Sequence, residues 1–352
     1  MRHSRRSTVS DKIQPAARDP LLPSLDAQAS VAQKLRHAIQ CAVLAPSSHN
    51  SQPWRFIVAD DAITLCADRM RALPVVDPFD RELIISCGAA LFNLRTALNH
   101  YGLRYRISLF PSEVDPDVLA HVEVHEAGFK DDSLGPLFNA IEQRATIRKP
   151  FARTPVSDAL KRSLTDAGQA EGARVVCIED ADGRERIAEL IAQADAQQFA
   201  DPRFRRELAA WIHPKRSVDG MPTEAAGVAA LLDLAVPIVA SAIRTFDIGG
   251  GMAAMHSELL EGSPLLLVIA TDRDDREAWL AAGQALERVL LCAVNNGLSA
   301  SYLNQPIEVE SLRARLRTEA GIEAAPQVLL RIGHGPHPVE RSPRRALSDV
   351  IW

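Results

Sequence analysis

A turn-rich segment at residues 46–54 carries the densest group of polar side chains in the chain. It reads Pro-Ser-Ser-His-Asn-Ser-Gln-Pro-Trp and lies between an expected helix and an expected strand. Its hydroxyl and carboxamide groups can each donate and accept hydrogen bonds, as the edge of a planar heterocycle with alternating acceptors and an N–H requires. The alternative is an ordinary helix-terminating turn, because Pro, Ser and Asn favour turns in any case.

Two clusters of cations could hold a phosphate. Residues 144–149, Arg-Ala-Thr-Ile-Arg-Lys, place three cations and a hydroxyl within six positions, and Arg341, Arg344 and Arg345 form a second cluster near the C-terminus. Guanidinium forks match phosphate oxygens, and a hydroxyl can join them. Taken singly, each cluster is more often a solvated basic surface. A third possibility, the Arg5-Arg6-Ser7 segment, lies far from the first expected helix.

Three other patterns are weaker. Gly249, Gly251 and Ala254 fit the G-x-G-x-x-A spacing of a dinucleotide loop, but residues 236–246 before them favour a helix, so we expect a flexible glycine-rich loop. The 334–337 segment has two histidines without a carboxylate or cysteine nearby, so a surface turn is favoured and no metal site is expected. His49 is assigned equally to a substrate contact or a local hydrogen bond. No catalytic triad spacing is found, and no catalytic side chain is predicted.

The elements around these motifs repeat within the chain. Helices are expected at residues 31–44, 82–101, 157–167 and 277–296, and strands at 55–58, 62–67, 103–110, 121–125, 174–178, 264–271 and 326–333. Six residues recur at a constant offset of 195: Gly88, Ala90, Leu91, Leu94, Gly102 and Leu103 match Gly283, Ala285, Leu286, Val289, Gly297 and Leu298. Small residues would allow close helix packing, and a glycine would form the left-handed cap. Two amphipathic helices that end in Gly-Leu could also match by chance.

Composition limits the class of protein. The 352 residues, 47% hydrophobic, suffice for two domains or one large α+β body. A net charge of −5 gives no bulk attraction to nucleic acid, and no apolar run approaches the ~20 residues that span a bilayer. Five cysteines without a C-x-x-C pair favour reduced thiols and a cytoplasmic protein. Residues 1–28 are expected to be a disordered tail.

The motifs resemble those of the FMN-dependent nitroreductase superfamily. Residues 45–56, A-P-S-S-H-N-S-Q-P-W-R-F, resemble the family's motif after the first helix, and 143–151, Q-R-A-T-I-R-K-P-F, resemble its arginine motif. Residues 264–306 and the basic stretch 341–350 also resemble that family. The two-half arrangement is similar to the Acg-type nitroreductase-like proteins of actinobacteria.

The resemblance implies an α+β fold whose two halves form an internal pseudo-dimer. Residues 29–130 would be a truncated first half, and 131–352 a second half with a lid-like insert at about 195–262. In the family dimer the arginine motif of one subunit and the Pro-Ser-Ser loop of the other share one FMN. Here the loop lies in half one and the arginines in half two, while residues 167–172 have lost the loop. One FMN per chain and a monomer are therefore expected.

Residue roles follow from the same resemblance. Arg144, Thr146 and Arg148 would bind the phosphate and ribityl chain, assisted by the C-terminal arginines, and Trp54 would belong to the core. The loop at 46–52 would face the isoalloxazine, and Asn304-Gln305 would approach its reactive side. The complete implied cofactor-binding set is Pro46, Ser47, Ser48, Asn50, Gln52, Arg144, Thr146, Arg148, Asn304, Gln305, Arg341, Arg344 and Arg345.

The implied activity is oxidoreduction. A hydride from NAD(P)H would pass through FMN to a nitro, quinone or similar small-molecule acceptor, with no nucleic acid or membrane partner. The alternative is a non-catalytic protein that stores FMN under a lid. Residues 211–222 of the insert, with Trp211 and His213 over the ring and Gly220 as a hinge, would form that lid, or else a surface loop packed elsewhere.

Overall fold

The computed structural model describes residues 22, 25–26, 28–125, 130–214, 217–222, 236–336 and 341–352. Almost all of the expected tail, with its Arg5-Arg6-Ser7 segment, lies outside the described residues, and so does His337.

The first half folds as a helix, a hairpin, a long helix and two further strands. Ser30 caps its first helix through a reciprocal pair with Gln33. Asp60 and Asp61 lie at the hairpin turn, where Ala59 N–H donates to the Ala62 carbonyl. The elements are α1 (Val31–Ala42), η1 (Ser48–Asn50), β1 (Trp54–Val58), β2 (Ala62–Ala67), η2 (Arg69–Arg71), α2 (Arg81–His100), β3 (Tyr105–Leu109) and β4 (Val118–Val124). The strands form an antiparallel sheet in the order β1-β2-β4-β3.

The second half repeats this topology. After η3 (Asp132–Leu137) and α3 (Phe138–Gln143) come α4 (Asp158–Gln169), β5 (Arg174–Ile178), β6 (Leu265–Thr271), α9 (Arg276–Asn295), β7 (Ser299–Tyr302), α10 (Gln305–Glu308), α11 (Glu310–Glu319), β8 (Ala325–Gly333) and η6 (Leu347–Asp349). The sheet order is β5-β6-β8-β7, which matches the first sheet strand for strand. The expected α+β fold of two related halves is therefore confirmed.

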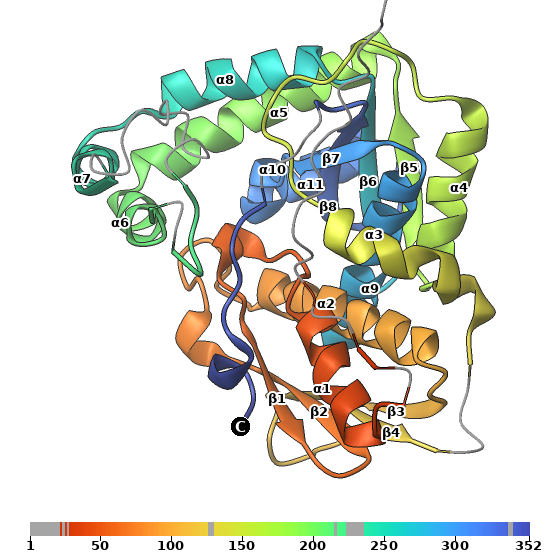
Figure 1. Cartoon of the computed structure of the whole chain (residues 1–352). Coiled ribbons are helices and arrows are strands. Elements are labelled where there is room, and N and C mark those ends of the chain that lie inside the picture. The colour runs from red at the N-terminus through yellow and green to blue at the C-terminus, as the bar shows by residue number, and fades with distance from the viewer. Residues whose placement is uncertain are drawn as a thin grey trace, which may run out of the picture.

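Helices α2 and α9 form the contact between the halves. Figure 1 shows them between the first sheet, below, and the second sheet, above. Gly88 and Gly283 face each other so closely that a Cβ on Gly283 would lie 2.8 Å from the Gly88 Cα and would overlap the Ile85 carbonyl. Gly102 and Gly297 end the two helices at φ of 72° and 70°. Both physical roles predicted for the repeated glycines are thus present.

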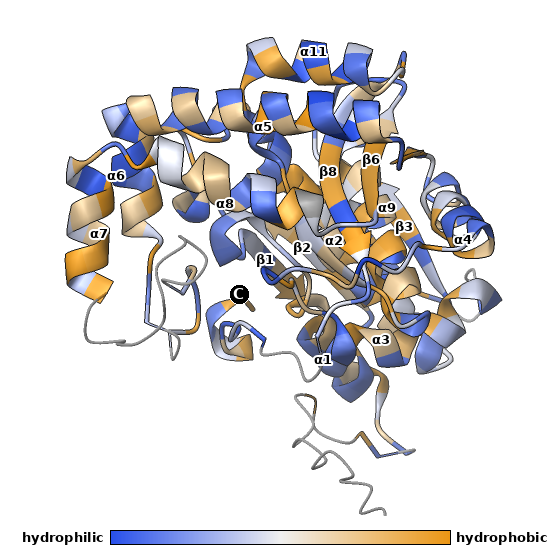
Figure 2. Ribbon diagram, turned by 90° about the horizontal axis from the view of Figure 1, so that it is seen from above, coloured by the Kyte–Doolittle hydropathy of each residue, from blue (hydrophilic) through white to orange (hydrophobic). Residues whose placement is uncertain are grey.

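Each side of this helix pair has its own hydrophobic core. The first contains Trp54 and Phe56, both without solvent exposure, and so confirms the core position expected for Trp54. The second packs α4 and α9 against the inner face of β6 and β8. Every residue of β6 is buried, and Figure 2 shows β6 and β8 as the hydrophobic centre of that half. No helix among the described residues is long and apolar enough to cross a membrane.

An insert replaces the tight hairpin turn between the first two strands of the second half. It contains α5 (Ala181–Ala200), α6 (Pro202–Ala210), α7 (Val236–Thr245) and α8 (Gly249–Glu261). In Figure 1, α5 and α8 run side by side along the top and α6 and α7 lie at the left. The loop expected around Gly249 is in fact the first turn of α8, and α7 rather than a strand precedes it. The strand–loop–helix context of a dinucleotide fold is therefore missing there.

The C-terminal segment returns to the first half. Phe56 N–H donates to the Val350 carbonyl at 2.7 Å, and Trp352 N–H donates to the Phe56 carbonyl at 2.9 Å. The chain end thus pairs with the free edge of β1. This pairing brings the arginines at 341–345 beside the loop that precedes β1.

Candidate functional site

The loop between α1 and β1 has an unusual backbone. His49, Asn50 and Gln52 all have positive φ, at 54°, 53° and 52°. Non-glycine residues seldom adopt this conformation, and it persists only where surrounding contacts hold it. Ser47 Oγ accepts from Gln52 N–H at 2.9 Å, and the Ser48 hydroxyl donates to Glu82 at 2.5 Å. Such a loop fixes the direction of several polar groups at once.

A cationic group faces this loop. Arg144 and Arg148 follow α3, and their segment lies along the edge of β7, where Ile147 N–H donates to the Ala300 carbonyl at 3.0 Å. Arg344 comes from the C-terminal segment and donates to Asn50 Oδ1 at 3.1 Å. The guanidiniums of Arg144 and Arg344 both donate to the Leu44 carbonyl, at 2.9 and 3.3 Å.

Positive charge exceeds negative charge at this end of the site. Among the described residues, the one carboxylate paired with these arginines is Glu287, 3.5 Å from Arg144 Nε, and Arg148 has no hydrogen bond or ion pair there. Burial, and then the neighbouring Arg144, lower the pKa of Arg344 to about 9. Burial also raises the pKa of Glu287 to about 7. A bound anion would relieve this accumulation of positive charge.

Several buried polar atoms at this end make no hydrogen bond to the described residues. They are His49 Nε2, the Tyr302 hydroxyl, and Nε of Arg144 and of Arg344. Burial, and then Arg148, lower the pKa of His49 to about 4, so its ring is neutral at neutral pH. Buried polar atoms without partners are costly, so their gathering at one pocket indicates space for a polar ligand.

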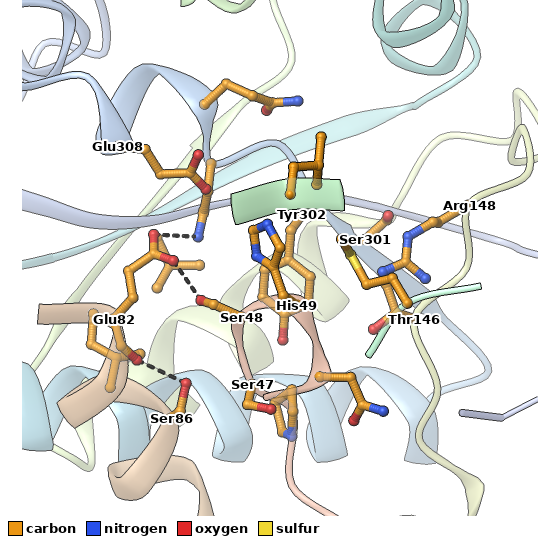
Figure 3. Close-up of a pocket in the computed structure, with 18 of the residues that line it drawn as sticks. Ser47, Ser48, His49, Glu82, Ser86, Thr146, Arg148, Ser301, Tyr302 and Glu308 are labelled. Atoms are coloured by element: carbon orange, nitrogen blue, oxygen red, sulfur yellow. Dashed lines mark hydrogen bonds between the residues drawn. The ribbon is translucent and has the colours of Figure 1, made fainter. Parts of the chain in front are cut away.

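The opposite end of the same pocket is acidic. Glu82 and Glu308 lie there, and Figure 3 shows them across from Thr146 and Arg148, with His49 and Tyr302 between. Gln198 donates to Glu308 at 2.5 Å, while Asn304 donates to Glu82 at 3.3 Å. Burial, and then Glu82, raise the pKa of Glu308 to about 8.

Comparison with known proteins gives the chain a family. A model of the nitroreductase family matches residues 141–334. "Putative NAD(P)H nitroreductase Rv3131" of Mycobacterium tuberculosis is 33% identical over 325 residues, which are 91% of each chain. "Putative NAD(P)H nitroreductase acg" of the same organism is 30% identical over 90% of this chain and 95% of its own. The chain belongs to the nitroreductase family.

The match to the relatives extends beyond the family model. The model begins within α3 and so covers the arginine motif but not the loop before β1, whereas both relatives match across about nine-tenths of the chain. A solved nitroreductase, FMN-dependent NfnB from Mycobacterium smegmatis in complex with NADPH, is 17% identical, with a TM-score of 0.41 over 62% of this chain and 97% of that one.

Most of the cofactor-binding residues predicted for this nitroreductase family member line the pocket described above. They come from the loop before β1, the segment after α3, the start of α10 and the C-terminal segment. The pocket-lining members are Pro46, Ser47, Ser48, Asn50, Arg144, Thr146, Arg148, Asn304, Gln305 and Arg344.

Three of the predicted residues do not line this pocket. Arg341 and Arg345 line an adjoining cavity, which shares Arg344 with the main pocket. Gln52 was expected at a cofactor ring but is completely buried and lines neither cavity. Its amide donates to the Val218 carbonyl at 2.8 Å and accepts from Arg345 N–H at 2.9 Å. Gln52 therefore connects the loop to the insert and to the C-terminal segment.

The lid residues also require correction. Trp211 packs in the core of the insert, and His213 hydrogen-bonds with Asp219 at 3.0 Å, so neither ring lines the pocket. Met221 lines it instead. Gly220 has φ of 75°, and a Cβ there would overlap His213, so this glycine forms a tightly packed turn rather than an open hinge.

Sequence reasoning missed the residue that holds the arginine motif in place. Arg331 in β8 is fully buried and donates to the carbonyls of Ile147 and Lys149, at 2.6 and 3.0 Å. Its guanidinium also lies 4.1 Å from the ring centre of Phe151. The available signal was a single arginine within an otherwise apolar strand.

Proposed function

We propose that this protein is an FMN-dependent NAD(P)H oxidoreductase that reduces a nitro, quinone or similar acceptor. The supporting observation is that Arg144 and Arg148 of the second half, with Arg344 of the C-terminus, share one pocket with the strained loop of the first half. The Nε atoms of Arg144 and Arg344 are buried and make no hydrogen bond to the described residues. This donor set fits a phosphate dianion.

Residues of the two halves would hold different parts of the cofactor. Arg144, Thr146, Arg148 and Arg344 would hold its phosphate, and the loop residues Ser47, Ser48 and Asn50 would lie along its ring. When bound, FMN supplies the hydride chemistry, taking a hydride from NAD(P)H and passing it to an acceptor. The protein contributes binding, orientation and the pocket's electrostatic environment.

The purified chain provides the first test. We expect a flavin absorbance spectrum, one FMN per chain, and oxidation of NADPH or NADH that depends on an added nitroaromatic or quinone. A colourless chain that does not take up added FMN contradicts the whole proposal. Because one chain supplies both sides of the pocket, we also expect a monomer in light scattering.

A second function, flavin binding without turnover, is supported by the contacts of the insert with the loop. Asn50 Nδ2 donates to the Gly220 carbonyl at 3.1 Å, and Met221 lines the pocket. An insert held in this position would limit access of nicotinamide. Full FMN occupancy with no acceptor-dependent oxidation of NADPH or NADH would favour this function.

A further inference from the structure

The acidic end of the pocket contains an aspartate–histidine pair contributed by the insert. Asp195 of α5 and His256 of α8 line the pocket, and His256 Nδ1 lies 2.7 Å from Asp195 Oδ2. Asp195 is 1% exposed, whereas His256 is 13% exposed. The carboxylate is therefore the more enclosed member of the pair, and the imidazole is the more accessible one.

The hydrogen bond with Asp195 fixes the ring chemistry of His256. A carboxylate accepts, so Nδ1 carries the proton that it donates, and in the neutral ring Nε2 is an acceptor. The amide nitrogen of Gln305 lies beside the ring, 3.0 Å from Nδ1 and 3.1 Å from Nε2. Gln305 Oε1 is buried without a partner.

We propose that His256 is the proton donor to the acceptor and that Asp195 positions it. This proposal rests on the oxidoreductase function proposed above. It makes the insert a part of the reaction site as well as a cover.

The chemistry of the acceptor requires such a donor. A quinone that takes up a hydride gains two electrons and one proton and becomes the hydroquinone monoanion. Transfer of the Nε2 proton of His256 to its oxygen completes the neutral hydroquinone and leaves a neutral imidazole. The imidazole then recovers a proton from water in the pocket. Positioned general acids typically contribute about 10²- to 10⁴-fold to the rate of such a step.

Charged and titratable groups share this end of the pocket with the imidazole. Asp195 faces it from α5, Glu308 from α10, and Glu82 from the start of α2, while Arg81 beside Glu82 is the opposing cation. Two further carboxyl groups, from two other elements, thus share the pocket with the pair.

Separation of the two half-reactions tests the proposal. The bound flavin is reduced by light and a sacrificial amine, without nicotinamide, and the enzyme is then mixed with 2-methyl-1,4-naphthoquinone in stopped flow. We expect His256→Gln to slow flavin reoxidation about 100-fold and Asp195→Asn to slow it less. Reduction by NADPH should change little. His125→Gln, which alters an exposed histidine paired with Glu123, is the matched control.

Three readouts exclude a merely structural role. Added imidazole should restore much of the reoxidation rate of His256→Ala, and the wild-type rate should fall with rising pH while that of His256→Gln stays flat. In the NMR spectrum of the purified chain, a low-field Nδ1–H proton should disappear in His256→Gln and move upfield in Asp195→Asn.

The outcomes separate this proposal from the proposed function. A photoreduced wild type that reacts with no acceptor contradicts the function, and the proton donor with it. A wild type that reacts, beside a His256→Gln variant that reacts equally fast, overturns the proton donor alone.

Discussion

Individual side chains give the pocket two ends of opposite charge. Arg144, Arg148 and Arg344 lie at one end, and Glu82 and Glu308 at the other. Enclosed charges of one sign repel strongly because little water screens them. The arginine end therefore favours an anion, and the carboxyl end favours protons. A cofactor that is anionic at its phosphate and consumes protons at its reacting ring matches this polarity.

Removal of one unpartnered arginine should weaken binding of the phosphate. We expect Arg148→Ala to reduce FMN affinity by about 1.5–3 kcal/mol, the scale of a charge-assisted hydrogen bond. Fluorescence titration of the flavin-free chain measures this. Arg174→Ala, which changes an arginine 62% exposed and paired with Asp272, should leave the affinity unchanged, as should Arg5→Ala. Equal losses in Arg148→Ala and Arg174→Ala, or a loss confined to Arg5→Ala, would place the phosphate elsewhere.

His49 should make the flavin-free chain less stable in acid. Burial, and then Arg148, lower its pKa from 6.5 to about 4, so between these values the unfolded chain binds a proton that the folded chain does not. Stability from this group is therefore complete above pH 6.5 and is lost as pH falls toward about 4.

Comparison with a matched variant isolates this contribution. His49→Asn keeps a residue that tolerates positive φ and removes the titration. Urea unfolding at several pH values should show a steeper decline from pH 6.5 to about 4 in the wild type. Parallel curves would show that His49 titrates normally in the folded state.

At this scale, the sequence predicts residues grouped in short segments better than residues brought together by folding. The loop and arginine motifs are each contained in fewer than ten positions, so composition and family resemblance were sufficient. Gln52 belongs to the same motif, yet the positive φ of its loop turns it away from the pocket. Asp195 and His256 are 61 residues apart on two helices, and no local pattern joins them.

Secondary-structure elements place these residues through repetition and one large insertion. Both sheets have the same strand order, and α2 and α9 pack across glycines. The hairpin turn of the first half is replaced in the second half by four helices, which carry Asp195 and His256. The two related halves thus form one pocket between them, and the insert adds side chains that the first half does not supply.

The glycine contact between α2 and α9 should be intolerant of even one methyl group. We expect Gly283→Ala to lower the free energy of unfolding by about 1–3 kcal/mol, because the new Cβ would overlap the Ile85 carbonyl of α2 and backbone cannot yield cheaply. Gly250→Ala, in α8 with nothing within 4 Å of the added Cβ, is the control and should be neutral or slightly stabilising. Thermal unfolding of both variants decides this. A Gly283→Ala variant as stable as Gly250→Ala would contradict the close contact.

The elements that periodicity did not predict are short or unusual. β7 has four residues, Ser-Ala-Ser-Tyr, and too little alternation to signal a strand. The turn at Gly249 contains three consecutive glycines, which disfavour a helix on propensity alone, yet α8 forms there and packs against α5. Tertiary packing overrides local preference at such positions. The sequence patterns predict α1, α2, α4, α9 and most strands within a few residues, but give no bounds for α5, α8 or α11.

At the scale of the whole molecule, the C-terminal segment is what joins the two halves into one site. It leaves β8 in the second half and pairs with β1 in the first, carrying Arg344 to the loop. The complementary position in the second half has no such loop. Flavin absorbance against protein concentration should therefore give one FMN per chain. Two per chain would mean that the degenerate position, at residues 167–172, still binds.

The position of the insert should limit how fast nicotinamide reaches the pocket. Its loop at 217–222 is bound to the first half by an ion pair between Asp219 and Arg71 and by the contacts of Gly220 and Val218 with Asn50 and Gln52. Deletion of residues 212–221 would open the pocket. It would also leave Asn50 and Gln52 without these partners. We expect that deletion to lower FMN occupancy as well.

A milder change separates the two effects. Asp219→Asn weakens the ion pair with Arg71 but keeps the backbone carbonyls that Asn50 and Gln52 use. Access through enclosing loops often governs the rate of such steps, so reduction by NADPH in stopped flow should become faster at unchanged FMN occupancy. Asp158→Asn, at an exposed site on α4, should leave the rate as in the wild type. An unchanged rate in Asp219→Asn at full occupancy would show that this loop packs against the first half without controlling entry.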